Sequence, residues 1–137
     1  MRFWDTSAIL PLIVLEAQSK ELTKLFASDR QIVVWWGSSI EVVSALSRLE
    51  REGSLSENHK AHAILDRLEA GWNEVNPSDS LRQIARRLLR VHVLRAADSL
   101  QLAAAMIASD SKPQTLAFVC RDERLSQAAR REGFSVQ

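Results

Sequence analysis

The chain has 137 residues with a formal net charge of +1, and 46% of its residues are hydrophobic. This length fits one domain that can bury a core without disulfide staples. Cys120 is the only cysteine, which excludes an internal disulfide and a cysteine-rich zinc site and suits a reducing compartment such as the cytoplasm. Because the overall charge does not attract phosphate, any nucleic-acid binding has to come from local patches.

Short apolar runs alternate with segments of helical periodicity, a pattern that predicts a parallel β-sheet wrapped by helices. The apolar stretch at residues 8–15 contains Pro11, where a kink is expected, and is too short to cross a bilayer, so no membrane or targeting segment is expected. In chain order we expect a strand at residues 2–4, helices at 6–15 and 21–27, a strand at 31–36, helices at 38–52 and 56–70, a strand at 72–75, helices at 78–90 and 96–109, a strand at 116–120, a helix at 123–131 and a strand at 134–136.

The helices are expected to turn their apolar faces toward the core. Segment 96–109 is apolar nearly all round and is expected to be buried. Trp4 is expected in the core, and Trp72 fits either the core or an interface. Core packing is the first expectation for Trp35 and Trp36 as well, with the alternative that one of these neighbours points toward a cleft or a partner. The inward side chains are expected to be Ile40, Val43, Leu46 and Leu49, then Ala61, Ile64, Leu65 and Leu68 in a helix capped by Ser56 and ended by Gly71, then Leu81, Ile84, Ala85, Leu88 and Leu89, and finally Leu125, Ala128 and Ala129.

Acidic residues stand where several of these helices begin. Asp5 follows the first strand directly, Glu41 lies at the start of the helix after the second strand, and Asp122 follows the strand at 116–120. A parallel sheet brings the carboxyl ends of its strands to one edge, so these three carboxylates are expected to converge. Asp98 follows a helix, and spacing alone does not bring it to that edge. Charges about 4 Å apart repel by about 4 kcal/mol in a medium of intermediate dielectric, so such a cluster needs protons or a divalent cation.

Helix capping is the alternative role for the acids, and it is the role assigned to Thr6. Ser38 and Glu41 have the spacing of a Ser-x-x-Glu capping box. The three aspartates can cap their helices or interact favourably with the positive end of the helix dipole, and either role contributes about 0.5 to 2 kcal/mol to helix stability. Gly53 is expected to end the helix that contains Glu41. The residues by themselves leave both roles open.

A basic stretch without any acid covers residues 81–97. Arg82, Arg86 and Arg90 recur there at helical spacing and form one stripe opposite the apolar face. A solvated surface is the simpler interpretation, and contact with RNA phosphates is the alternative. Arg121 is a further candidate phosphate contact that can equally pair with a neighbouring acid.

Four motifs occur in order along the whole chain: Asp5-Thr6-Ser7-Ala8, Ser39-Ile40-Glu41, the run RAADSLQLA that begins at Arg95 and contains Asp98, and Asp122-Glu123-Arg124-Leu125 followed by Gly133-Phe134. Together they resemble a PIN domain and, more narrowly, the VapC toxins of bacterial toxin–antitoxin pairs. The resemblance implies an α/β fold, with a single PIN-like nuclease domain over residues 1–137 and a central parallel sheet of four to five strands flanked by helices. Many relatives carry Thr or Ser where this chain has Cys120, which is expected to be a buried small hydrophobe.

The same resemblance implies a metal-dependent ribonuclease. Asp5 is implied as the central ligand of Mg²⁺ or Mn²⁺, Glu41 and Asp98 as residues that complete or position the ligand set, and Asp122 as a direct or water-mediated contributor. Carboxylate oxygens without His or Cys suit these hard ions, which activate water for phosphodiester hydrolysis. Ser7 is a supporting candidate whose hydroxyl can orient Asp5, and it fits equally well as an ordinary first-turn residue.

The implied partners are an RNA substrate, a VapB-like antitoxin and a second copy of the chain in a homodimer. An inactive PIN-like module that binds RNA or protein is the alternative function. A receiver- or phosphatase-type domain is a third possible function, although such a domain has a second acid at the position where this chain has Ser7. The histidines lack metal-ligand spacing and are expected to be surface or structural. Candidate interface stripes, which can also be internal, are Leu22, Leu25 and Phe26, and Leu65 and Leu68.

Overall fold

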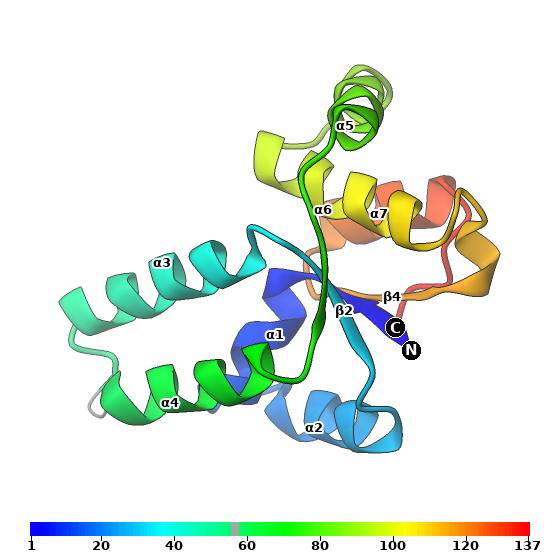
Figure 1. Ribbon diagram of the computed structural model, residues 1–137. Coiled ribbons are helices and arrows are strands. Elements are labelled where there is room, and N and C mark those ends of the chain that lie inside the picture. The colour runs from blue at the N-terminus through cyan, green and yellow to red at the C-terminus, as the bar shows by residue number, and fades with distance from the viewer. Residues whose placement is uncertain (56–57) are drawn as a thin grey trace.

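The computed structural model describes residues 1–55 and 58–137. Four parallel strands form one sheet in the order β3-β2-β1-β4, which confirms the predicted α/β class with a parallel sheet (Figure 1). The strand expected at residues 134–136 is reduced to a single bridge between Phe118 and Val136. The strands are β1 (Arg2–Trp4), β2 (Ile32–Trp35), β3 (Asn73–Val75) and β4 (Ala117–Val119).

Helices cover both faces of this sheet (Figure 1). Successive strand residues point to opposite sides, so Phe3 and Val33 pack with α5, α6 and α7, whereas Trp4 and Val34 pack with α1 to α4. Within residues 1–55 and 58–137, no helix is long and apolar enough to cross a membrane. The helices are α1 (Thr6–Ile13), α2 (Ser19–Ser28), α3 (Ser38–Arg51), α4 (Asn58–Glu69), α5 (Asp79–Val91), α6 (Ala96–Ala108), the short η1 (Pro113–Thr115) and α7 (Glu123–Arg131).

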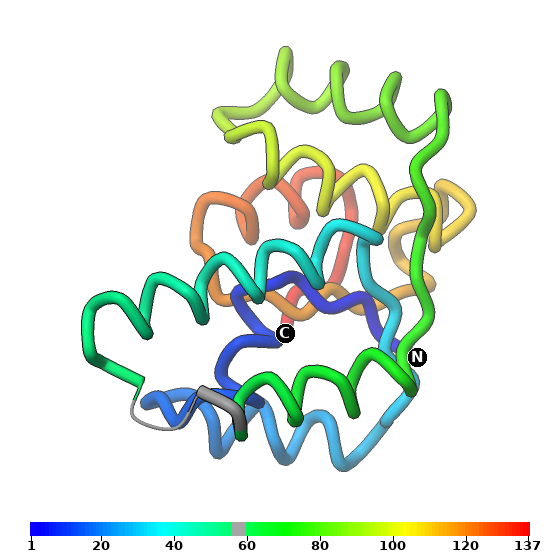
Figure 2. The backbone as a smooth tube through the Cα atoms, turned by 60° about the vertical axis from the view of Figure 1, so that its left-hand side comes forward, coloured from blue at the N-terminus to red at the C-terminus, as the bar shows by residue number. Residues whose placement is uncertain are grey.

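Helix α3 buries a different face from the one predicted. It lies beside α4 (Figure 2) and packs against α1 and α4 through Ser38, Val42 and Leu46, which repeat every four residues. Ile40 is 60% exposed and Val43 is 38% exposed, so their placement in the core was wrong. The sequence offers two overlapping apolar stripes on this helix, and the structure buries the one that contains Val42 and Leu46. Leu89 of α5 is likewise exposed rather than buried, whereas Leu125, Ala128 and Ala129 of α7 are buried as predicted.

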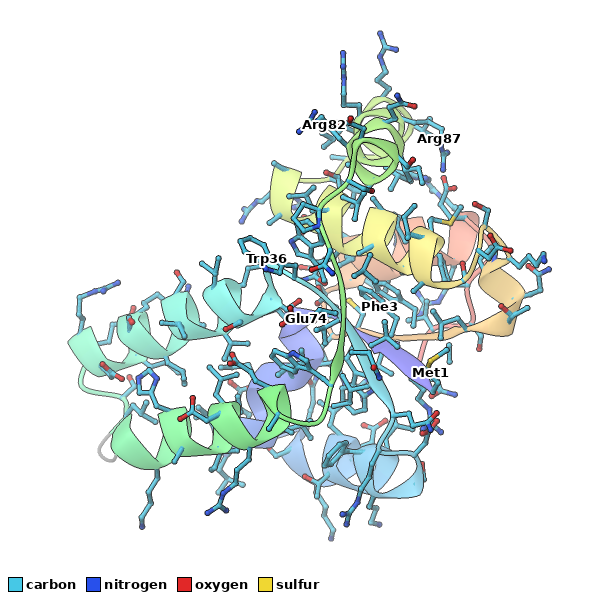
Figure 3. All side chains as sticks on the ribbon, in the orientation of Figure 1. Met1, Phe3, Trp36, Glu74, Arg82 and Arg87 are labelled. Carbon is cyan, nitrogen blue, oxygen red and sulfur yellow. The ribbon has the colours of Figure 1, made fainter. Side chains whose placement is uncertain are left out.

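The tryptophans divide between core and surface. Trp4, Trp35 and Trp72 are buried, whereas Trp36 is 45% exposed at the turn before α3, contrary to prediction (Figure 3). Strand β2 ends at Trp35, whose indole lies so close to Gly37 that a Cβ there would come within 2.4 Å of its Nε1 atom. A glycine at this position therefore lets the chain turn tightly from β2 into α3.

The helix ends were predicted from Pro, Gly and capping residues, and one of them differs from the structure. Pro11 lies inside α1, which ends two residues later, so the expected continuation to Leu15 was wrong. Gly53 has a φ of 71° just after α3, which confirms its predicted role in ending that helix. The predicted cap Ser56 and the side chain of His59 lie outside the described residues.

The other two histidines are structural. Glu132, at the end of α7, accepts hydrogen bonds from Arg87 of α5 at 2.7 Å and pairs with the buried His92 at 2.7 Å. Arg87 first and then His92 hold the pKa of Glu132 below its usual range. His62 lies 3.0 Å from Glu50. The apolar stripes considered for an interface are largely internal, because their members belong to or pack against the core between the sheet and α1 to α4.

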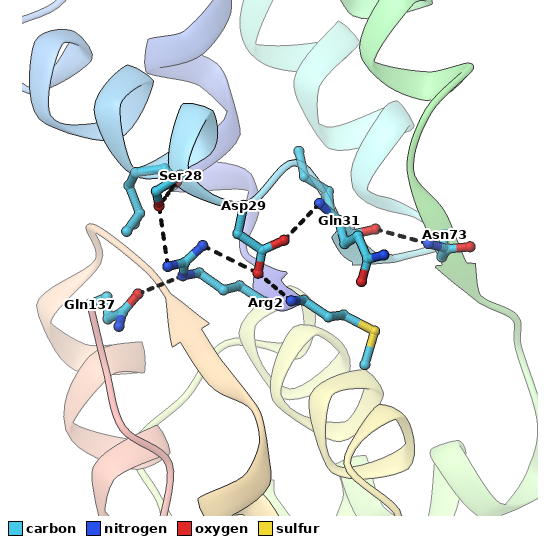
Figure 4. A network of polar contacts seen from close by, with 9 residues as sticks. Arg2, Ser28, Asp29, Gln31, Asn73 and Gln137 are labelled. Carbon is cyan, nitrogen blue, oxygen red and sulfur yellow. Dashed lines mark hydrogen bonds and ion pairs between the residues drawn. The ribbon is translucent and has the colours of Figure 1, made fainter.

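Paired charges lie at the amino-terminal edge of the sheet (Figure 4). Arg2 contacts Asp29 at 3.4 Å and Gln137 at 2.9 Å, and the amino group of Met1 also pairs with Asp29. The ammonium group of Met1, followed by the backbone N–H of Gln31, lowers the pKa of Asp29 from its usual value. At this edge the negative charge of Asp29 is therefore balanced by positive groups of the protein, Arg2 and the amino group of Met1.

Candidate active site

Asp5 lies at the carboxyl end of β1 and forms the N-cap of α1. Its backbone N–H donates to the carbonyl of Val119 in β4 at 3.0 Å, and its Oδ2 accepts the backbone N–H of Ser7 at 3.0 Å. Asp5 is only 4% exposed. Burial, the largest influence, raises the pKa of Asp5, hydrogen bonds from Ser7 and Cys120 lower it, and the charge of Asp98 raises it again. Asp5 therefore caps α1, and its burial there makes the ionised carboxylate less favourable than it is in water.

The capping box considered for Glu41 is not formed. Helix α3 has Gly37 at its N-cap position without a side-chain cap bond, and the Ser38 hydroxyl accepts a hydrogen bond from the Gln101 amide at 3.0 Å. The Oε1 atom of Glu41 accepts from the same amide at 3.3 Å. Thr6 also hydrogen-bonds Glu41, so its assignment to capping was wrong; Asp5 is the cap of α1. The side chain of Glu41 therefore belongs to a tertiary network between α1, α3 and α6.

Three carboxylates act on one another at this edge. Burial is the largest cause of a raised pKa at Glu41, and the charges of Asp5 and Asp98 add to it. The charge of Asp98 also raises the pKa of Asp5. Gln101, one helical turn after Asp98, is hydrogen-bonded to Glu41, so helix α6 brings Asp98 toward the acids that follow β1 and β2. Asp98 has a capping contact as well, since its Oδ2 accepts the backbone N–H of Arg95 at 3.1 Å.

Asp122 stands apart from these three acids. Its side chain is exposed, and its Oδ1 accepts the backbone N–H of Leu125 at 2.8 Å as the N-cap of α7. The backbone N–H of Asp122 donates to Cys120 Sγ at 3.3 Å, and that sulfur lies 3.6 Å from Asp5 Oδ2. Asp122 is thus linked to the site by the contact of its backbone N–H with Cys120, while its carboxylate caps the start of α7.

Ser7 and Cys120 surround the Asp5 carboxylate with neutral donors. The Ser7 hydroxyl donates to Asp5 Oδ2 at 2.5 Å and accepts the backbone N–H of Arg121 at 2.9 Å, which links α1 to the segment after β4. Cys120 is buried as predicted, and burial followed by the charge of Asp5 raises the pKa of its thiol to about 12. Cys120 therefore remains a neutral thiol that can donate to Asp5.

The predicted phosphate contacts lie on surfaces of different character. On α5, Arg82 pairs with Asp79 at 2.9 Å with both side chains exposed, and Arg86 and Arg90 are exposed as well (Figure 3). Arg121 pairs with Glu21 of α2 at 3.1 Å, as the ion-pair interpretation of that residue expects. The α5 stripe is a solvated face of the outermost helix, and contact with RNA stays a prediction for all four arginines.

Gln101 was not predicted as a site residue, yet it links α6 to the site residues on α1 and α3. It is 1% exposed, and its amide contacts Thr6, Ser38 and Glu41. The signal that could have found it is an amide one helical turn after Asp98 in an otherwise apolar helix.

The donor chemistry of the site fits a hard divalent cation. Asp5, Glu41 and Asp98 offer only carboxylate oxygens, and burial together with mutual repulsion makes a nearby positive charge favourable. Among the described residues, no three His, Cys, Asp or Glu side chains lie close enough to form a ready-made metal site. Binding of an ion would therefore have to draw these carboxylates closer together.

No family model and no curated protein sequence matches this chain. Solved structures do share its fold. A structure described as a toxin-antitoxin complex from Klebsiella pneumoniae contains a chain that is 15% identical with a TM-score of 0.64, covering 92% of this chain and 91% of that one. The crystal structure of FitAcB from Neisseria gonorrhoeae contains a chain that is 17% identical with a TM-score of 0.67, covering 99% of this chain and 96% of that one. At these identities the likeness establishes the fold, and the site has to supply the argument for function.

Proposed function

We propose that this chain is a Mg²⁺- or Mn²⁺-dependent endoribonuclease of the PIN-domain type. The observation that carries the proposal is the arrangement at the carboxyl edge of a parallel sheet, where Asp5 follows β1 and Gln101, one helical turn after Asp98 on α6, is hydrogen-bonded to Thr6 and Glu41. Burial and repulsion both disfavour the ionised carboxylates, and a divalent cation offsets both effects. The ordered motifs in the sequence support the same conclusion.

Asp5, Glu41 and Asp98 would hold the ion. Bound there, it would polarise the scissile phosphate and lower the pKa of an attacking water. Ser7 and Cys120 both contact Oδ2 of Asp5, so they would fix the orientation of this carboxylate. Asp122 borders this arrangement and is proposed as a direct or water-mediated contributor.

We further propose that the nuclease is a VapC-like toxin that forms a homodimer and is silenced by a VapB-like antitoxin. The fold similarity to a chain of a toxin-antitoxin complex supports this proposal. Substrate RNA would meet the exposed arginines of α5, where Arg86 and Arg90 have no acid at the adjacent helical turn, unlike Arg82. We place the protein in the cytoplasm with its RNA substrate.

The test is RNA cleavage by the purified chain, freed of any antitoxin, in Mg²⁺, Mn²⁺ or chelator. Asp5→Asn is expected to reduce the cleavage rate by about a hundredfold or more. Asp29→Asn is the matched control, because it makes the same substitution at the opposite edge of the sheet and should cleave like the wild type. Cleavage that survives both chelator and Asp5→Asn would reject the metal mechanism. RNA binding without any cleavage would favour the inactive RNA-binding module.

A further inference from the structure

Gln101 is an amide side chain buried in an apolar helix. It lies in the second turn of α6, three residues after Asp98, and is 1% exposed. The neighbouring residues 102–105 of α6 are all fully buried and apolar. A buried amide is unfavourable unless it is hydrogen-bonded, so its contacts explain why the fold tolerates it.

One atom of Gln101 joins three helices. Its Nε2 donates to Thr6 Oγ1 of α1 at 2.9 Å, to Ser38 Oγ of α3 at 3.0 Å and to Glu41 Oε1 of α3 at 3.3 Å. An amide nitrogen has two hydrogens, so the three acceptors share them. An ionised carboxylate only accepts hydrogen bonds, which requires the nitrogen rather than the oxygen of the amide to face Glu41.

Glu41 has solvent close by as an alternative to the inner network. Glu41 itself is partly exposed, and the outer face of α3, with Ile40 and Val43, is open to solvent. Without a donor on the inner side, the carboxylate would gain hydration by rotating outward. Thr6 and Gln101 are the two donors that hold it inward.

We propose that Gln101 is a positioning residue that holds Glu41 toward Asp5 and Asp98 in the geometry that binds the metal ion. This inference rests on the proposed metal-dependent nuclease function. Helix α6 then supplies a carboxylate from its first turn and an orienting amide from its second. Partners that orient metal ligands in this way typically contribute about 10- to 100-fold to metal affinity.

The primary experiment is calorimetric titration of Mn²⁺ into the RNA-free protein, with cleavage measured in parallel. Gln101→Met keeps the size of the side chain and removes the amide, and it is expected to weaken Mn²⁺ binding by about tenfold or more. Ser109→Ala is the control, because Ser109 is also buried, at the C-cap of α6, and its hydroxyl donates only locally, to the carbonyl of Met106. This control is expected to bind Mn²⁺ like the wild type even where it loses stability.

A double substitution separates positioning from general support of the fold. In the Glu41→Gln background, Gln101→Met is expected to weaken Mn²⁺ binding no further, because the group that it positions has already changed. An equal additional loss in that background would overturn the inference, as would wild-type affinity in Gln101→Met.

Two conservative variants keep the inference testable if Gln101→Met does not fold. Thr6→Val removes one of the two donors to Glu41, whereas Ser38→Ala leaves both in place. Mn²⁺ affinity should therefore fall more for Thr6→Val than for Ser38→Ala. Equal affinities would overturn the premise that donors to Glu41 support metal binding, and with it the inference. If the wild type itself binds no Mn²⁺, or Asp5→Asn binds it equally well, the proposed function fails together with this inference. Wild-type binding that requires Asp5 but not Gln101 rejects the inference alone.

Discussion

The two edges of the sheet hold aspartates in opposite electrostatic settings. At the amino edge, Asp29 is paired with Arg2 and the amino group of Met1, and its pKa is lowered (Figure 4). At the carboxyl edge, Asp5 is buried near two further acids, and its pKa is raised. The protein therefore compensates one acidic charge itself and leaves the other uncompensated. An uncompensated carboxylate cluster is the arrangement expected where a cation is to bind.

The difference does not come from the residue type, since both side chains are aspartates that accept a backbone N–H two residues further on. It comes from burial and from the charges that the fold places nearby. Asp29 keeps 26% of its side chain exposed and has cationic neighbours, whereas Asp5 is 4% exposed and has acidic ones. Burial without a cationic partner is the physical feature that distinguishes the proposed metal site from a structural ion pair.

The largest expected effect is stabilisation by the ion. At a Mn²⁺ concentration about 100 times Kd, the free energy of unfolding of the wild type should increase by about 2.7 kcal/mol. Asp29→Asn should show the same increase and Asp5→Asn should lose it, as measured by denaturant unfolding with and without Mn²⁺. Equal stabilisation of Asp5→Asn would remove the distinction between the two edges.

A smaller effect is expected in the ion-free protein. Asp5→Asn should raise the free energy of unfolding by about 1 kcal/mol, because it removes a buried charge, and Asn is as good an N-cap as Asp. Urea unfolding in chelator measures this change. A loss of similar size would instead show that the Asp5 charge mainly stabilises the start of α1.

The pH dependence should differ in sign between the two edges. The pKa of Asp5 is raised in the folded state, so its ionisation makes the ion-free protein less stable as pH rises above about 3.8, and the advantage of Asp5→Asn should vanish at lower pH. The pKa of Asp29 is lowered, so its contribution is present above about 3.8 and is lost as pH falls through the folded pKa. Unfolding curves of both variants in chelator between about pH 3 and 7 test this. Parallel curves would contradict the comparison.

The smallest effect is expected from Asp29→Asn itself. Its ion pairs are at the surface, so the substitution should lower stability only slightly near neutral pH, and added salt should reduce the difference. Thermal unfolding at low and high salt measures it. Loss of Mn²⁺ binding in this variant would show that the amino edge, rather than the carboxyl edge, supports the metal site.

Much of the fold could be predicted from local pattern. The β-branched run of β2, the glycine after α3 and the apolar face of α7 each follow from rules that act within a few residues. The failures occurred where two local solutions compete. Helix α3 could bury either of two stripes, and it packs against α1 and α4 with only one of them. Trp36 could continue β2 or leave it, and it lies at the surface after the strand has ended.

For the site, the sequence by itself determined that Asp5 and Asp122 follow strands and that Glu41 lies at the start of the helix after the second strand. Parallel strand order then brings residues that follow β1 and β2 to one edge. Only the tertiary structure decided that Gln101 of α6, three residues after Asp98, contacts Thr6 and Glu41, because helix packing and burial are set by segments far apart in the chain. Those nonlocal contacts, and the pKa shifts they cause, have no counterpart in residue spacing.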